Sequence, residues 1–158
     1  MDRLEQIIAR VLTEDSIKLE IRNAGVFRFL ASYRFERHNH REIEIIYIKS
    51  GHCIVGTDES FLPFREGDCM ILHKGVPHWF LVDKKETCQI AQLEFDLEIP
   101  DYFRDAFIFF GAKRFQKLSG CEMVGELLES IGRRHRLTGN SSYDNLQMKL
   151  LFFQLFAE

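Results

Sequence analysis

The chain has 158 residues, of which 46% are hydrophobic and 28% are charged, and its formal net charge is −3. This length suits a single domain, and this composition is typical of a folded protein rather than a disordered one. An acidic chain whose longest basic run is "RRHR" (133–136) lacks the clustered basic surface of a duplex-binding protein, and no segment has the roughly 20 apolar residues of a membrane span.

Residues 1–15 predict a short N-terminal helix or arm. Apolar residues recur there at helical spacing on one face, at Leu4, Ile7, Ile8, Val11 and Leu12. The stretch contains no uninterrupted apolar region of the kind that a secretory signal needs. We therefore expect a cytoplasmic protein.

Residues 16–118 predict a β-barrel. The hydrophobic period changes to two, and short runs rich in Ile, Val, Phe and Tyr alternate with turn residues. The predicted strands are 16–21, 26–35, 43–51, 52–58, 59–64, 68–74, 78–83 and 89–95. Short strands at regular spacing favour an antiparallel sandwich or barrel, so the predicted fold class is mainly β.

Four cysteines are spread along the chain, at Cys53, Cys69, Cys88 and Cys121. None of them forms a C-x-x-C pair, which argues against a zinc ribbon or a redox motif. We expect free thiols that are buried in a reducing compartment.

Residues 119–158 predict two amphipathic helices. The segment 121–135 places Met123, Val124, Leu127, Leu128 and Ile131 on one stripe. The segment 141–158 begins with possible N-cap residues and carries a second apolar face, and Gly-Asn at 139–140 separates the two. An antiparallel helical pair is the simplest arrangement.

Polar residues cluster near residue 40. His38 and His40 are two apart, so both rings face one way on an extended strand, and Glu44 has the same parity. With His78, they offer three imidazoles and a carboxylate, which suit a divalent Fe, Mn, Ni or Zn ion. Contact with a polar ligand and a structural network of satisfied polar groups are the two alternatives.

Four further residues are candidates for ligand contact. Phe80 shares the parity of His78 and faces the barrel interior. Gln92 and Glu94 share one face of a strand and suit bidentate contacts to sugar hydroxyls, with solvent exposure as the alternative. Arg37 could meet an anionic or hydroxyl-rich ligand, although a surface position is the default for an arginine. The predicted ligand-binding set is His38, His40, Glu44, His78, Phe80, Gln92, Glu94 and Arg37.

Two segments resemble the two motifs of the cupin superfamily. The first match comprises His38, His40, Glu44 and Gly51, and the second comprises Gly67, Gly75 and His78. A cupin barrel that ends in an "LEF" strand and continues into two helices is similar to the N-terminal sensing domain of AraC-family transcription regulators. This resemblance covers about residues 16–158. It implies a cupin-like double-stranded β-helix, or jelly-roll barrel, followed by two C-terminal amphipathic helices.

The resemblance implies an effector-binding domain rather than an enzyme. Its expected ligand is a small polar metabolite, with a sugar as the first candidate, and no cofactor is required. DNA would be bound only through a helix-turn-helix domain that follows the second helix in the family and is absent from this chain. The alternative is a metal-dependent cupin enzyme, an oxygenase or an isomerase, whose ion would be held by His38, His40, Glu44 and His78. A purely structural dimerisation module is a third interpretation.

The segment 119–158 is also predicted to form a homodimer. Apolar residues surround the helix between Leu146 and Phe156 on more than one side, which is more apolar surface than one helix face buries on its own barrel. A two-fold pairing of the same patch is the simplest cover. A monomer whose last helix folds back on its own barrel is the alternative.

Overall fold

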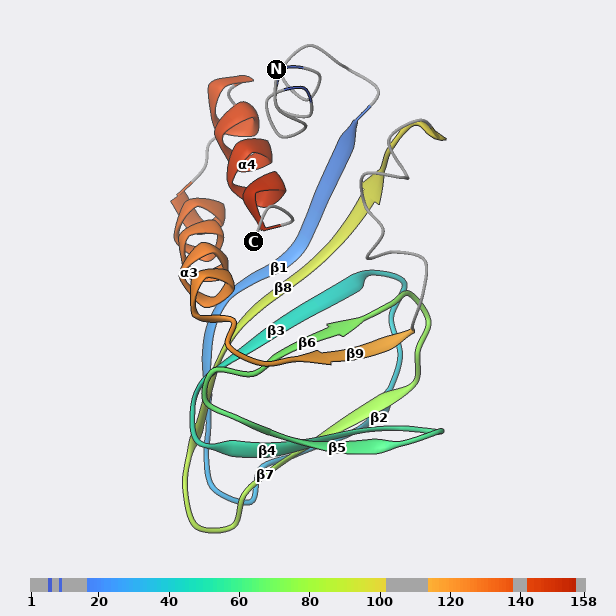
Figure 1. The fold of residues 1–158 in the computed structure, drawn as a ribbon, viewed down its shortest axis with the longest axis vertical. Helices are drawn as coiled ribbons and strands as arrows, with labels where there is room; N and C mark the ends of the chain where they lie inside the picture. The colour runs from blue at the N-terminus through green and yellow to red at the C-terminus, as the bar shows by residue number, and fades with distance from the viewer. Residues whose placement is uncertain (1–5, 7–8, 10–16, 102–113, 138–141, 156–158) are drawn as a thin grey trace.

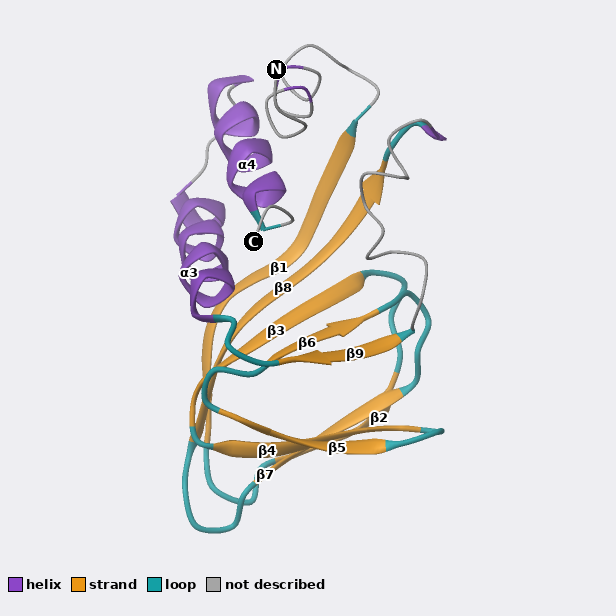
Figure 2. Cartoon of the chain, viewed as in Figure 1, coloured by secondary structure: helices purple, strands orange, loops and turns teal. Residues whose placement is uncertain are grey.

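The computed structural model describes residues 6, 9, 17–101, 114–137 and 142–155. Two antiparallel sheets lie face to face, and two helices stand beside the larger one (Figure 1, Figure 2). The larger sheet has the spatial order β1 (Lys18–Phe29), β8 (Cys88–Glu98), β3 (Ile43–Ser50), β6 (Cys69–Leu72) and β9 (Phe115–Leu118). The smaller sheet has the order β2 (Arg34–His38), β7 (His78–Val82), β4 (His52–Thr57) and β5 (Phe61–Arg65). This arrangement, with α3 (Glu122–Leu137) and α4 (Ser142–Gln154), confirms the predicted mainly-β jelly roll with two C-terminal helices.

The strand boundaries differ from the prediction at the start of the barrel. The expected break between residues 21 and 26 is wrong, because β1 continues through it and pairs along its length with β8. A register shift between Ile21 and Asn23 lets the strand bend without ending. The chain turns instead at Ser32, which has a φ of 64°, and β2 then joins the opposite sheet.

Two further differences concern the ends of the predicted segments. β9 is not among the predicted strands, since its four residues are too few for a clear alternation, and its place depends on pairing with β6. The predicted N-terminal helix lies outside the described residues, apart from Gln6 and Ala9. The predicted break at 139–140 also lies outside them.

Strand β3 separates two hydrophobic clusters. Ile46 and Ile48 face the space between the two sheets, whereas Ile43, Ile45 and Tyr47 face the helices. A strand buried on both faces needs apolar residues at almost every position, which explains the continuous run in this segment. The larger sheet is therefore the shared wall between the barrel interior and the helical layer.

Helix α3 packs directly on the outer face of the larger sheet through two glycines. A Cβ atom on Gly132 would lie 2.8 Å from the Cα of Gly25 in β1, and one on Gly125 would lie 2.4 Å from the ring of Tyr47. Leu127, Leu128 and Ile131 are buried in this contact as predicted. Met123 was predicted on the same stripe but is 49% exposed, since it lies at the first turn beyond the edge of the contact.

Helix α4 and the residue that follows it bury four apolar side chains within the chain. Phe152 is fully buried, with its ring centroid 4.7 Å from that of Phe95 in β8, and Met148, Phe153 and Leu155 are also buried. The apolar surface left for a partner is therefore smaller than the sequence indicated. None of the described helices is long and apolar enough to cross a membrane.

The four cysteines are free thiols, as predicted. Cys53, Cys69 and Cys88 are buried, and Cys121 is partly exposed just before α3.

Candidate functional site

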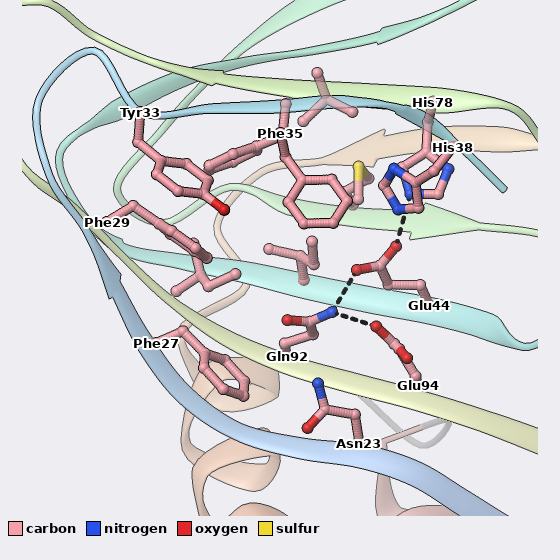
Figure 3. Close-up of a pocket in the computed structure, with 15 residues that line it drawn as sticks. Asn23, Phe27, Phe29, Tyr33, Phe35, His38, Glu44, His78, Gln92 and Glu94 are labelled. Atoms are coloured by element: carbon pink, nitrogen blue, oxygen red, sulfur yellow. Dashed lines mark hydrogen bonds and ion pairs between the residues drawn. The ribbon is translucent and has the colours of Figure 1, made fainter. Parts of the chain in front are cut away.

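A cavity of about 280 Å³ lies between the two sheets. One end, here called the polar end, is lined by Asn23, His38, Glu44, His78, Gln92 and Glu94 (Figure 3). The other, here called the aromatic end, is lined by Phe27, Phe29, Tyr33, Phe35 and Phe80, with aliphatic side chains behind them. The cavity therefore has two chemically different halves.

Three histidines gather at the polar end with the same anchoring pattern. His38 and His78 are register partners on β2 and β7, and His40 follows in the loop that leads to β3. Each Nδ1 lies beside a backbone carbonyl: His38 Nδ1 is 2.9 Å from Glu36 O, His40 Nδ1 is 3.0 Å from Glu42 O, and His78 Nδ1 is 2.8 Å from Val76 O. Because a carbonyl only accepts, each Nδ1 carries hydrogen, and each Nε2 is left for a second partner.

Glu44 is the centre of the polar end. Its carboxylate is almost fully buried, and Oε2 lies 3.2 Å from His40 Nε2 and 3.3 Å from His78 Nε2. Burial alone would raise the pKa of Glu44, but the hydrogen bonds from His40 and His78 outweigh it and lower the pKa to about 2. The hydrogen bond with Glu44 in turn raises the pKa of His40, whereas burial lowers the pKa of His38.

Gln92 links two carboxylates across neighbouring strands. Its Nε2 donates to Glu44 Oε1 at 2.6 Å and to Glu94 Oε1 at 2.7 Å. Burial, followed by the charge of Glu44, raises the pKa of Glu94. On the outer side, Arg22 bonds Glu42 through Nη1 at 2.9 Å, and its Nε lies 3.6 Å from Glu94 Oε2. Three carboxylates therefore stand close together at this end of the barrel.

The aromatic end is a wall of contacting rings. The ring centroid of Phe29 lies 4.7 Å from that of Tyr33 and 5.3 Å from that of Phe80. Phe35, which is 44% exposed, lies near the boundary between the two ends, with its ring 4.4 Å from that of His38. These faces offer apolar contact area to a ring-shaped ligand group.

A family model for the AraC-like ligand binding domain matches residues 23–156. The match spans most of the chain and includes all residues of the polar and aromatic ends. The chain belongs to the AraC-like ligand binding domain family. A search of curated proteins found no significant match.

The solved structures that are similar to this AraC-like domain have low sequence identity to it. The protein YhaK from Escherichia coli superposes with a TM-score of 0.51 and 14% identity, over 70% of this chain and 52% of YhaK. This chain thus spans about half of the length of YhaK. An oxalate decarboxylase variant from Bacillus subtilis gives a TM-score of 0.42 and 22% identity, over 45% of this chain and 20% of that one. A cupin-2 domain protein from Shewanella frigidimarina gives a TM-score of 0.39 and 17% identity, over 51% of this chain and 72% of that one.

The structure brings most of the predicted ligand-binding residues of the AraC-like domain together. Those that line the cavity are His38, Glu44, His78, Phe80, Gln92 and Glu94. His40 lies behind this wall and reaches it through its contact with Glu44. Their contact with a ligand stays a prediction, but their convergence is a feature of the structure.

Arg37 does not reach the cavity. Its guanidinium forms a two-point ion pair with Asp58, with Nε 2.8 Å from Oδ1 and Nη2 2.6 Å from Oδ2, and both side chains are exposed. Adjacent residues of a strand point to opposite faces, so the inward position of His38 turns Arg37 outward. This placement corrects the prediction that Arg37 meets the ligand.

Sequence analysis missed Asn23 and, apart from Phe80, the aromatic end as parts of the site. Asn23 lies where a break in the strand was expected, so it had no predicted face. Phe27 and Phe29 match the pattern of ordinary core residues, and only the closure of the barrel distinguishes a cavity wall from a filled core. The parity of Phe27 and Phe29 with Asn23 is the signal that could have placed them on one face.

The residues at the polar end fit a divalent metal ion. The ligand atoms of His38, His40 and His78 lie within 4.8 Å of one another, and so do those of His40, Glu44 and Glu94. The backbone carbonyls hold each Nδ1–H, so that each Nε2 faces the site, where it would coordinate a metal; in its absence Nε2 of His40 and of His78 bond Glu44. An ion held there by His38, His40, His78 and Glu44 would supply Lewis acidity or open coordination positions.

Proposed function

We propose that this chain is the effector-binding domain of an AraC-type transcription regulator and that it binds a small molecule in its barrel without catalysis. The two-ended cavity is the observation that carries the proposal. A purely structural module has no use for a buried carboxylate whose partners converge on an open cavity. A sugar is one candidate, since its hydroxyls would meet Gln92 and Glu94 at the polar end.

A thermal-shift screen of sugars, organic acids and amines tests the proposal. We expect at least one class to raise the melting temperature, because a ligand that binds only the folded state stabilises it. Val55→Phe narrows the cavity and is expected to abolish the shift, since Val55 lines the wall on β4. Leu81→Phe on β7 is the matched control, because Leu81 points to the outer face. A shift that survives in Val55→Phe would place the binding site elsewhere.

A metal-dependent cupin enzyme is the second candidate, and the anchored histidines are the observation that favours it. If the domain is a sensor without a required ion, chelation is expected to leave its melting temperature and ligand affinity unchanged. The reason is that His40, His78 and Gln92 already satisfy the oxygens of Glu44. Elemental analysis of protein purified without a His tag, before and after EDTA dialysis, checks this. One bound ion per chain, whose removal lowers the melting temperature by several degrees, would favour the enzyme.

The helices are the proposed route from the cavity to the rest of the regulator. α3 packs on the face of β1, β3 and β8 opposite to the cavity, so a ligand that displaces these strands also displaces α3. We place DNA binding in a helix-turn-helix domain that follows the second helix, and the protein in the cytoplasm. A dimer formed through the helices would set the spacing of two such domains.

The dimer is expected to depend on the apolar residues that remain uncovered on the helices. Leu137 is 84% exposed at the end of α3, and Leu150 is half-buried on α4. Leu137→Glu and Leu150→Glu are each expected to convert the dimer to a monomer in light scattering at micromolar concentration. Gln154→Glu adds the same single negative charge at an exposed position of α4 and is the control. A monomeric parent, or a dimer indifferent to both leucine variants, would show that the helices are not the interface.

A further inference from the structure

The size of the cavity limits its ligand to about one ring and a short chain. A cavity of about 150 Å³ in a protein core accommodates one benzene molecule. By that measure, the cavity of about 280 Å³ between the sheets has room for roughly ten to twelve non-hydrogen atoms. A disaccharide or a long acyl chain exceeds this space, whereas a monosaccharide and a substituted single ring both fit.

The aromatic end distinguishes between these two. Phe27, Phe29, Tyr33 and Phe80 present aromatic rings, and the aliphatic side chains Ile46, Val55, Met70 and Ile90 also line the cavity. A monosaccharide has hydroxyls around its whole periphery and would leave several of them without partners against this wall, at a cost for each. An aromatic ring has no hydroxyls that need partners there, and it gains stacking contacts with the wall.

The polar end offers Gln92 Oε1 as a hydrogen-bond acceptor, beside the amide of Asn23, which can donate or accept. The two hydrogens of Gln92 Nε2 are both used by the carboxylates of Glu44 and Glu94, which fixes the orientation of the amide. The carbonyl oxygen of Gln92 therefore points away from them, towards the aromatic end (Figure 3). A ligand group that reaches this point must donate a hydrogen bond to it.

The charges around the polar end also favour a cation. Glu42, Glu44 and Glu94 bring three carboxylates together, and Arg22 pairs with two of them from the exposed outer side. From the inner side, Glu44 bonds the imidazoles of His40 and His78, and Glu94 bonds the amide of Gln92, with the imidazole of His40 nearby. An anionic ligand group beside Glu94 would face a like charge, whereas an ammonium group would be attracted by this carboxylate.

We propose that the cavity takes a small aromatic amine, with its ring at the aromatic end and its ammonium group donating to Gln92 Oε1 and Glu94. This proposal rests on the proposed function, because it names the class of effector for the same cavity. The preference for an amine comes from Glu94 and Gln92 on β8, and the preference for a ring comes from Phe29 and Phe80. It replaces the sugar that the sequence suggested as the first candidate.

Isothermal titration of the whole chain with four probes tests the inference. The probes are 2-phenylethylamine, 2-phenylethanol, phenylacetate and D-glucose, so that the first three share a ring and differ only in the charge of the polar group. We expect the amine to bind at least about tenfold more tightly than the alcohol, and the alcohol more tightly than phenylacetate or glucose.

Two variants separate the role of Glu94 from that of the cavity. Glu94→Gln keeps an acceptor oxygen for Gln92 but removes the charge, and is expected to reduce the preference for the amine over the alcohol to less than about threefold. Glu20→Gln is the control, because Glu20 is exposed on β1. An unchanged amine preference in Glu94→Gln overturns the inference.

The same titrations distinguish failure of the inference from failure of the proposed function. Tightest binding by glucose or phenylacetate, abolished by Val55→Phe, overturns the inference while the cavity remains the effector site. Absence of binding by all four probes also overturns it. The proposed function fails only if no compound of the wider thermal-shift screen binds in the cavity.

Discussion

Glu44→Ala is expected to lower the free energy of unfolding by about 3 to 5 kcal/mol at neutral pH and to abolish ligand binding. The carboxylate of Glu44 is buried and bonds three groups, so its loss leaves His40, His78 and Gln92 without their central partner. Urea unfolding measures the first effect, and titration with the best ligand of the screen measures the second. Glu59→Ala in the exposed turn after β4 is the control, expected to change stability by less than about 0.5 kcal/mol.

The pH dependence of the free energy of unfolding is a second measure of how much Glu44 stabilises the fold. The folded pKa of Glu44 is about 2, compared with an ordinary value of 4.5, so the unfolded chain takes up its proton first as the pH falls. Glu44 therefore contributes its full stabilisation above about pH 4.5 and loses it as the pH falls towards 2, by on the order of 3 kcal/mol in total. The pKa of His40 is raised above 6.5, so this imidazole is protonated in the folded and in the unfolded chain below pH 4.5. It therefore does not alter the direction in which stability changes with pH there.

The comparison with Glu44→Gln isolates this contribution from those of other carboxylates. Urea unfolding of the parent and the variant at several values between pH 6 and pH 3 is expected to show a steeper loss of stability in the parent. Parallel curves would mean that Glu44 is not held as a buried ion pair, and the description of the polar end would be wrong.

Gly132→Ala is expected to lower the free energy of unfolding by about 2 kcal/mol or more, which is roughly 5 °C in melting temperature. Alanine normally stabilises the interior of a helix by about 1 kcal/mol relative to glycine. Here the added Cβ would lie 2.8 Å from the Cα and 3.0 Å from the backbone nitrogen of Gly25. These are backbone atoms of β1, which cannot rotate away, so α3 must move off the sheet.

Differential scanning calorimetry of this variant needs a control on the same helix. Glu126→Ala serves, because Glu126 is exposed on α3 and alanine there meets no neighbouring strand. A melting temperature for Gly132→Ala equal to or above that of the parent would show that the helix is not seated on β1 at this distance. The proposed coupling between the cavity and α3 would then lose its structural basis.

The polar end was largely predictable from strand alternation, since parity alone relates Gln92 to Glu94, and the same rule relates Phe80 of the aromatic end to His78. The same rule, applied to the neighbour of His38, would have excluded Arg37. The proximity of Gln92 to Glu44 was not predictable, because it depends on the pairing of β3 with β8, which are 48 residues apart at this contact.

The rest of the aromatic end could not be predicted, for a different reason. Phenylalanines on an inward face fill the core of most barrels, and the sequence pattern is the same whether they meet across the interior or leave a cavity. The answer depends on the separation of the two sheets, which the alternation along one strand does not determine. The contact between Gly132 and Gly25 has the same origin, since neither glycine lies in a turn that would explain it.

Methyl NMR of methionine-labelled protein tests most directly the claim that the effector binds in this cavity. Met70 lines the cavity wall on β6, Met148 lies in the core of α4, and Met123 is exposed on α3. Titration with 2-phenylethylamine, or with the best ligand of the screen, is expected to shift the Met70 methyl signal until saturation while the Met123 signal stays in place. Saturable binding that shifts only Met123 or Met148 and leaves Met70 unmoved would contradict the account.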